Sequence, residues 1–125
     1  MISEHSSAIV KELRPNTSRS GEPVELLIFG NDLTLAISAH ALAVYRHPDC
    51  FNDPLGNGLV RTVDLPDDAV LQVDNGKLVA KIQSGCVDLH DGKILLILPN
   101  EIRLYPDRES ALRNCNVLAQ LPLVD

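Results

Sequence analysis

The hydrophobic pattern is strongest between residues 93 and 105, where an apolar run precedes an alternating segment. Residues 94–98 are all apolar and have a turn signal on each side. A run of this length is typical of a strand covered on both faces, and it is too short to span a membrane. Ile102 and Leu104 then alternate with polar or aromatic neighbours, as in a strand with one solvated face. The pattern predicts a hairpin whose first strand is central in its sheet.

The same pattern occurs sixty residues earlier without a gap. The turn pair Asn31-Asp32 falls against Asp91-Gly92. We therefore predict that 27–45 and 87–105 are equivalent three-stranded units in two pseudo-equivalent halves. Any two hairpins share alternation, so a coincidence of period is the competing interpretation. The matching apolar and aromatic positions are Leu35, Ile37, Leu42, Val44 and Tyr45 against Leu95, Ile97, Ile102, Leu104 and Tyr105.

Turn chemistry predicts a further hairpin between these two units. Segments 69–73 and 77–82 flank Asn75-Gly76, which is typical of a two-residue hairpin turn. An alternative for the alanine-rich segment 34–46 is a helix with Asp32 as its N-cap. The sixty-residue correspondence favours strands there.

The period changes to that of a helix after Tyr105. Asp107 has the side chain of an N-cap, and Pro122 follows the apolar positions. We predict one amphipathic C-terminal α-helix whose apolar stripe packs on a sheet. The stripe consists of Ala111, Leu112, Cys115, Leu118 and Ala119.

These elements together predict a mainly β fold. We expect an antiparallel barrel or sandwich of about seven to eight strands with one C-terminal α-helix. Residues 1–22 are polar and punctuated by Pro15 and Gly21, which predicts a flexible N-terminal arm. Residues 23–125 then form a single β-rich domain, for which 45% hydrophobic residues supply the core.

Composition and charge exclude several classes of function. The net charge is −6 at pH 7 with scattered Lys and Arg, and aromatic residues make up only 3%, which argues against binding to nucleic acid. No apolar run has membrane length and the N-terminus lacks the apolar core of a signal peptide, so we expect a cytoplasmic protein without membrane contact. Three widely spaced cysteines fit reduced thiols better than disulfides.

The turn-rich loop 47–58 offers candidate metal ligands in His47, Asp49, Cys50 and Asp53. A zinc site would combine His47 and Cys50 with Cys86 and His90, and this spacing is not that of a zinc finger. The order of acidic residues does not match a calcium-binding EF-hand loop. Turn formation explains the same residues without a metal.

Catalytic motifs are absent from the sequence. Cys86, Asp88 and His90 alternate along a predicted strand, where the first and last would be about 13 Å apart, too far for a nucleophile and its base. There is no P-loop, dinucleotide-binding or hydrolase motif. We therefore predict no catalytic residue and no cofactor, which favours a non-catalytic protein over an enzyme.

The sequence thus favours a cytoplasmic binding or regulatory module that acts through protein–protein contacts, as a homo-oligomer. The apolar segment 93–98 and several small residues would leave a face that another backbone could approach closely. The alternative is a small β-barrel with a ligand or metal site near the 47–58 loop. A third interpretation is an enzyme whose site forms at a subunit interface. The small residues are Ala36, Ser38, Ala41 and Ala43.

Overall fold

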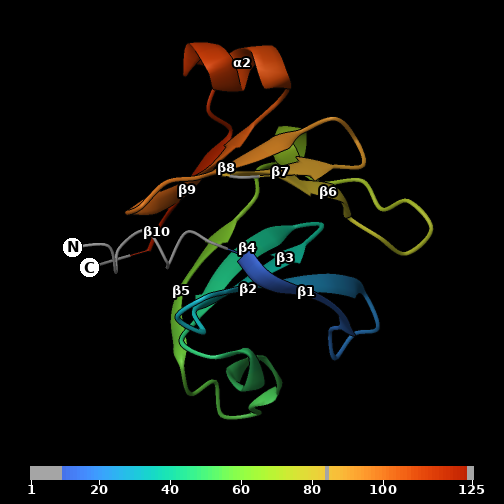
Figure 1. The fold of residues 1–125 in the computed structure, drawn as a ribbon. Coiled ribbons are helices and arrows are strands. Elements are labelled where there is room, and N and C mark those ends of the chain that lie inside the picture. The colour runs from blue at the N-terminus through green and yellow to red at the C-terminus, as the bar shows by residue number, and fades with distance from the viewer. Residues whose placement is uncertain (1–9, 84, 124–125) are drawn as a thin grey trace.

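The chain folds into two five-stranded antiparallel sheets, in which every strand pairs with its neighbour in sequence (Figure 1). The computed structural model describes residues 10–83 and 85–123. Sheet one contains β1 (Val10–Thr17), β2 (Pro23–Phe29), β3 (Thr34–Ser38), β4 (Ala41–Tyr45) and β5 (Leu59–Asp64). Sheet two contains β6 (Val79–Gln83), β7 (Cys86–Leu89), β8 (Ile94–Ile97), β9 (Glu101–Tyr105) and β10 (Ala119–Pro122). The apolar run is therefore the central strand of sheet two, as predicted.

Short helical segments connect the strands. They are η1 (Pro48–Asn52), η2 (Asp67–Ala69) and α2 (Arg108–Arg113). Segment η1 contacts β4, and α2 contacts β8 and β9. Figure 1 shows α2 above sheet two and η1 below sheet one, so each outer face carries one helical segment. The described residues contain no helix with the length and apolarity that a membrane span requires.

One hydrophobic core lies between the two sheets and takes side chains from both. Leu35 in β3 and Leu95 in β8 are completely buried at its centre. Burying a large apolar side chain stabilises a fold by roughly 1.5–3 kcal/mol, so the two halves stabilise each other. Strand β5 lies beside β10. The described strands nevertheless form two open sheets without a closed barrel, which confirms the mainly β prediction and its two halves.

The strand register repeats at the offset found in the sequence. Leu35 pairs with Val44 in sheet one, and Leu95 pairs with Leu104 in sheet two. The preceding pair of strands agrees as well, since Leu27 and Val87 are the other partners of Leu35 and Leu95. Two strands paired in the same register place their side chains on the same faces. The correspondence is therefore structural and not only a shared alternation.

The turn between β2 and β3 and the turn between β7 and β8 are also equivalent. Asn31 Oδ1 accepts the N–H of Leu33, and Asp91 Oδ1 accepts the N–H of Lys93. The next residue takes a left-handed conformation in both turns, with φ of 70° at Asp32 and 95° at Gly92. Asn and Asp favour such turns because their side chains bond the backbone two residues on. The turn pairs that the sequence aligned thus have the same backbone shape.

The described residues contain ten strands, more than the predicted seven to eight. One addition is β1, which lies within residues 1–22, predicted as an arm; residues 1–9 are outside the described part. Its charged residues and Pro15 suit an edge strand, where one row of backbone groups has no partner. The other addition is β10, which lies where the sequence predicted helix.

The predicted C-terminal helix was wrong in length. Asp107 is its N-cap, as predicted, and accepts the N–H of Ser110. The helix ends at Asn114, which is left-handed with φ of 53°. Leu112 is 81% exposed, and Leu118 leads into β10. The predicted stripe failed because Asn114 ends the helix and residues 119–122 pair with β9 as a strand, which supplies partners for their backbone groups.

The hairpin predicted around Asn75-Gly76 was wrong in part. Both residues take the expected left-handed conformation, but only the bridge between Asp74 and Lys77 forms, and 69–73 is not a strand. This segment crosses from sheet one to sheet two, and its backbone finds partners elsewhere. Leu71 N–H donates to the carbonyl of Ala39, for example.

Candidate functional site

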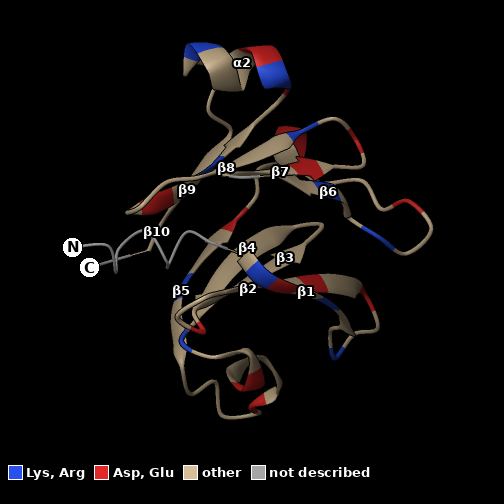
Figure 2. Ribbon diagram, viewed as in Figure 1, with Lys and Arg blue, Asp and Glu red and all other residues tan. Residues whose placement is uncertain are grey.

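The outer face of sheet one contains a hollow of about 260 Å³ that is lined by β2, β3, β4, β5, the turn before β2 and Phe51 of η1. Its floor consists of Val24, Ala36 and Ala43, which belong to a second apolar cluster outside the main core. An antiparallel sheet with one covered face normally presents polar residues to water on the other. Figure 2 shows β3 and β4 without charged residues. We call this region the outer hollow of sheet one.

The hollow exists because sheet one has small side chains where sheet two has large ones. At the sixty-residue offset, Ala36, Ser38, Ala41 and Ala43 correspond to Leu96, Leu98, Glu101 and Arg103. All four small residues line the hollow, so the sequence grouped them correctly. The apolar segment 93–98 lies in sheet two instead, so the predicted single face is divided between two sheets.

The equivalent face of sheet two is covered by a polar network. Arg103 pairs with Glu101 and donates to Asn114 Oδ1 at 2.8 Å. The buried Tyr105 donates its O–H to the same oxygen at 2.6 Å. The alternation predicted this face to be solvated. The prediction was wrong for Tyr105, which is buried and bonds Asn114 at the end of α2, whereas Glu101 and Arg103 remain partly exposed. Sheet one has Ala43 at the position equivalent to Arg103.

Two aromatic residues close one end of the hollow. The rings of Tyr45 and Phe51 meet edge to face with centroids 5.7 Å apart, a favourable geometry for aromatic pairs. Phe51 is carried by η1, whose N-cap His47 accepts the N–H of Asp49 through Nδ1. Burial raises the pKa of the Tyr45 phenol, which therefore stays uncharged at neutral pH. No local pattern in the sequence indicated that Phe51 would reach this face.

The other end of the hollow is hydroxylic and acidic. Ser18, Ser20 and Glu22 line it from the turn between β1 and β2. Ser38 Oγ donates to the carbonyl of Ala41, and Thr62 Oγ1 donates to that of Leu42. No histidine or cysteine lines the hollow, and Glu22 is its one carboxylate.

The candidate metal ligands in the 47–58 loop have turn and packing roles. His47 caps η1 and lies 3.6 Å from Asp49, and Asp53 accepts the N–H of Leu55. The thiol of Cys50 packs under Gly58, where a Cβ would lie 2.2 Å from the sulfur. Within residues 10–83 and 85–123, no group of three or more His, Cys, Asp or Glu side chains is placed to hold a metal ion. A metal at this loop stays a prediction from sequence alone.

Three alternating side chains, along β7 and at the residue after it, make separate contacts. They are Cys86, Asp88 and His90. Asp88 accepts hydrogen bonds from Gln83 and Arg108, each at 2.9 Å. His90 faces Asp74, with 3.5 Å between Nδ1 and Oδ2. Cys86 is half-buried and is a free thiol, like the other two cysteines. The structure therefore does not bring a nucleophile and a base together here.

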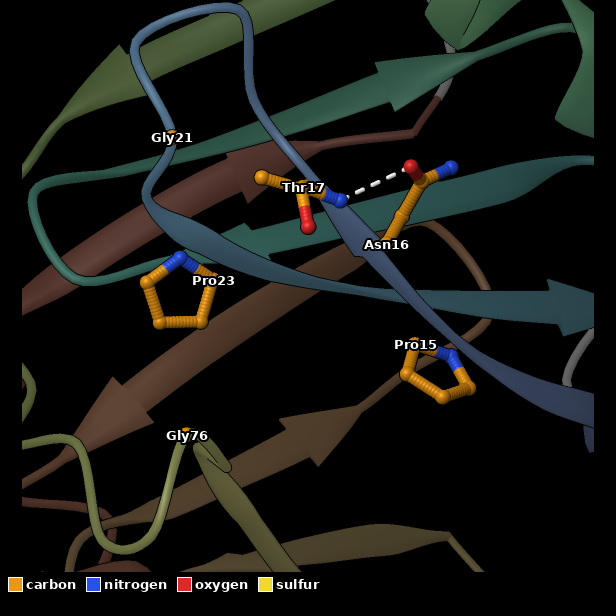
Figure 3. A pocket seen from close by; sticks show the side chains of 6 residues that line it. All are labelled: Pro15, Asn16, Thr17, Gly21, Pro23 and Gly76. Carbon is orange, nitrogen blue, oxygen red and sulfur yellow. Dashed lines mark hydrogen bonds between the residues drawn. The ribbon is translucent and has the colours of Figure 1, made fainter.

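A second crevice, of about 390 Å³, lies between sheet one and the 74–77 turn (Figure 3). Pro15 and Pro23 line it on one side and Gly76 on the other. Asn16, its one amide side chain, already accepts the N–H of Thr17 at 2.8 Å. This crevice has no charged side chain in its lining, whereas the outer hollow of sheet one has Glu22. It therefore has fewer groups with which to bind a ligand.

Comparison with protein-family models, curated proteins and solved structures found no match to this chain. The two equivalent outer faces of the chain differ. That of sheet two carries the network of Arg103, Tyr105 and Asn114, whereas that of sheet one has a hollow lined by small side chains.

Proposed function

We propose that the protein is a non-catalytic, cytoplasmic binding module whose outer hollow of sheet one contacts another protein chain, a second copy included. The observation that carries the proposal is the hollow over Ala36 and Ala43, where the equivalent positions of sheet two carry the larger Leu96 and Arg103. Ala43 is partly exposed at its floor, and Ala36 is 5% exposed. Small residues also let another chain approach the sheet closely.

The size of the hollow favours a protein partner over a small ligand. Pockets for small molecules commonly have volumes of about 300–1,000 Å³ and enclose most of the ligand. The outer hollow has about 260 Å³ and opens to solvent. It suits one or two side chains of a partner, with the surrounding sheet surface providing further contact area.

The second candidate is a small-ligand site near the 47–58 loop. One observation favours it, because Phe51 from this loop lines the hollow beside Tyr45. The four candidate metal ligands of the loop do not line the hollow. A ligand here would be apolar and held by the aromatic end.

The proposal is tested by filling the hollow. Ala36→Leu restores the side chain found at the equivalent Leu96, and Ala43→Leu is the second variant should the first fail to fold. Ala80→Leu makes the same change at an exposed position of β6. Sedimentation velocity measures self-association, and a photo-crosslinking residue at Thr62 captures other partners in cells.

We expect self-association or a defined crosslinked partner in the wild type and in Ala80→Leu, and its loss in either hollow-filling variant. Contacts that persist unchanged in both folded variants would place the interaction surface elsewhere. A wild type that shows neither kind of contact would contradict the proposal.

A further inference from the structure

We infer that the segment seated in the outer hollow comes from a different protein and carries an extended cationic side chain, lysine or arginine. The inference rests on the proposed function and specifies its partner. The carbon stem would lie along the alanine floor, and the charged end would lie at the acidic end of the hollow.

The first step is the distribution of charge around the hollow. Glu22 lines one end, and Asp64 is the register partner of Ala41, which lines the same end. Residues directly opposite in an antiparallel pair point to the same face of the sheet, so Asp64 lies on the outer face with Glu22. Both residues are exposed. Neither carboxylate forms an ion pair with any residue that the structure describes, the nearby Arg19 included.

The second step is the length and polarity of the floor. Ala43 and Ala41 are two residues apart on β4, a distance of about 6.6 Å along a strand. Lysine and arginine bury their carbon stems on apolar surface while their charged heads remain hydrated. The apolar floor and acidic end of the hollow are arranged in that order, with Tyr45 beyond the stem.

The third step is the choice between a second copy and another protein. The chain has a net charge of −6 at pH 7, so copies of it repel one another on average. No Lys or Arg lines the hollow to offset the Glu22 carboxylate. A basic segment of a different protein therefore has the complementary charge.

The test uses the full chain, labelled with ¹⁵N, and two synthetic peptides with blocked ends. The first peptide is Ala-Leu-Lys-Leu-Ala, and the second replaces its lysine with norleucine, which has the stem without the ammonium. Amide shifts of Ala36 and Ala43 report binding. The protein variants are Glu22→Gln, Asp64→Asn and, as a control carboxylate that does not line the hollow, Asp67→Asn.

We expect saturable shifts with the lysine peptide and weaker binding of the norleucine peptide. Each of Glu22→Gln and Asp64→Asn should weaken the lysine peptide about two- to fivefold, the range of exposed ion pairs, and Asp67→Asn should not. Salt at about 0.5 M should weaken it as well.

Three results overturn the inference. Equal binding of both peptides would mean that the hollow selects apolar stems without regard to charge, and the proposed function would stand. A second such result is that Ala36→Leu abolishes self-association and no other contact. The partner would then be a second copy, and the proposed function would stand. Failure of both peptides, with no contact sensitive to Ala36→Leu, would remove the inference and the proposed function together.

Discussion

At the scale of single residues, Glu25 links the two halves in a way that the repeat does not share. It lies in β2, is 4% exposed, and its Oε2 accepts the N–H groups of Leu78 and Val79 at 2.6 Å each. The residue sixty positions on is Gly85. Within residues 10–83 and 85–123 the chain crosses between the sheets once, between β5 and β6, so only one half needs an acceptor for the crossing backbone.

Glu25→Ala should be strongly destabilising. Each buried N–H left without an acceptor costs about 1–3 kcal/mol, so the two together should lower the free energy of unfolding by about 2–6 kcal/mol. Urea denaturation measures this, with Glu22→Ala as an exposed control expected within about 0.5 kcal/mol of wild type. Equal stability of the two variants would show that the crossing backbone has another acceptor.

Asp91 is the corresponding acceptor of backbone N–H groups on the sheet-two side of the crossing. Its side chain is 4% exposed, pairs with Lys93 at 2.9 Å and accepts the N–H of Gln72. Burial opposes its charged form, but the hydrogen bonds from Lys93 and Gln72 outweigh burial and hold the pKa of the carboxyl below its usual value. Asn31 makes the same turn in sheet one without a charge.

The stability that Asp91 contributes should depend on pH. A carboxyl with a lowered pKa stabilises the fold above its unfolded pKa of about 3.9, and this contribution is lost as pH falls through the folded pKa. Wild type should therefore be more stable than Asp91→Asn near neutral pH, and the difference should shrink from about pH 6 to about pH 3. A difference that stays constant over this range would contradict the role of the charge.

At the scale of elements, the end of α2 determines which residues of the C-terminal region are buried. Leu112 is 81% exposed on the short helix, whereas Leu121 in β10 is 1% exposed. Helical spacing predicted instead that Leu112 would be buried, because Leu112 falls on the predicted apolar stripe. The left-handed Asn114 ends the helix before that stripe is completed.

Leu112→Ala and Leu121→Ala form a matched test of this arrangement. Leu112→Ala should change the free energy of unfolding by no more than about 0.5 kcal/mol. Leu121→Ala should lower it by about 2–5 kcal/mol, as cavities in cores do. Denaturant midpoints of the two variants provide the comparison, and a larger loss for Leu112→Ala would favour the long helix.

The sequence predicted elements well where local pattern decides them. Alternation and the turn pairs located β3, β4, β8 and β9, because strand period and turn chemistry are local properties. It failed where distant partners decide. The hairpin at 69–82 depended on Glu25, more than fifty residues away, and β10 depended on pairing with β9. The same division holds for the lining of the outer hollow. The four small residues were grouped correctly from the sequence, but Phe51 was not grouped with them.

At the scale of the whole molecule, two similar sheets share one core but have different outer faces. The inner residues match across the repeat, since Leu35 and Leu95 are both fully buried. The outer residues diverge, since Ala36 corresponds to Leu96 and Ala43 to Arg103. A common core fixes the inner face, and the outer face is free to take another role. In sheet one, the role that we propose is the binding of a partner at the outer hollow.

The most direct test of this account measures the stability of Ala36→Leu and its association on the same sample, both with itself and with the Ala-Leu-Lys-Leu-Ala peptide. A leucine in an open hollow buries more apolar surface without overpacking, so the free energy of unfolding should stay equal to that of wild type or rise by up to about 1 kcal/mol, while association is lost. Ala69→Leu, at a fully buried core position, should instead lose about 1–3 kcal/mol through overpacking. A loss of stability in Ala36→Leu as large as in Ala69→Leu, or association that persists in the folded variant, would contradict the account.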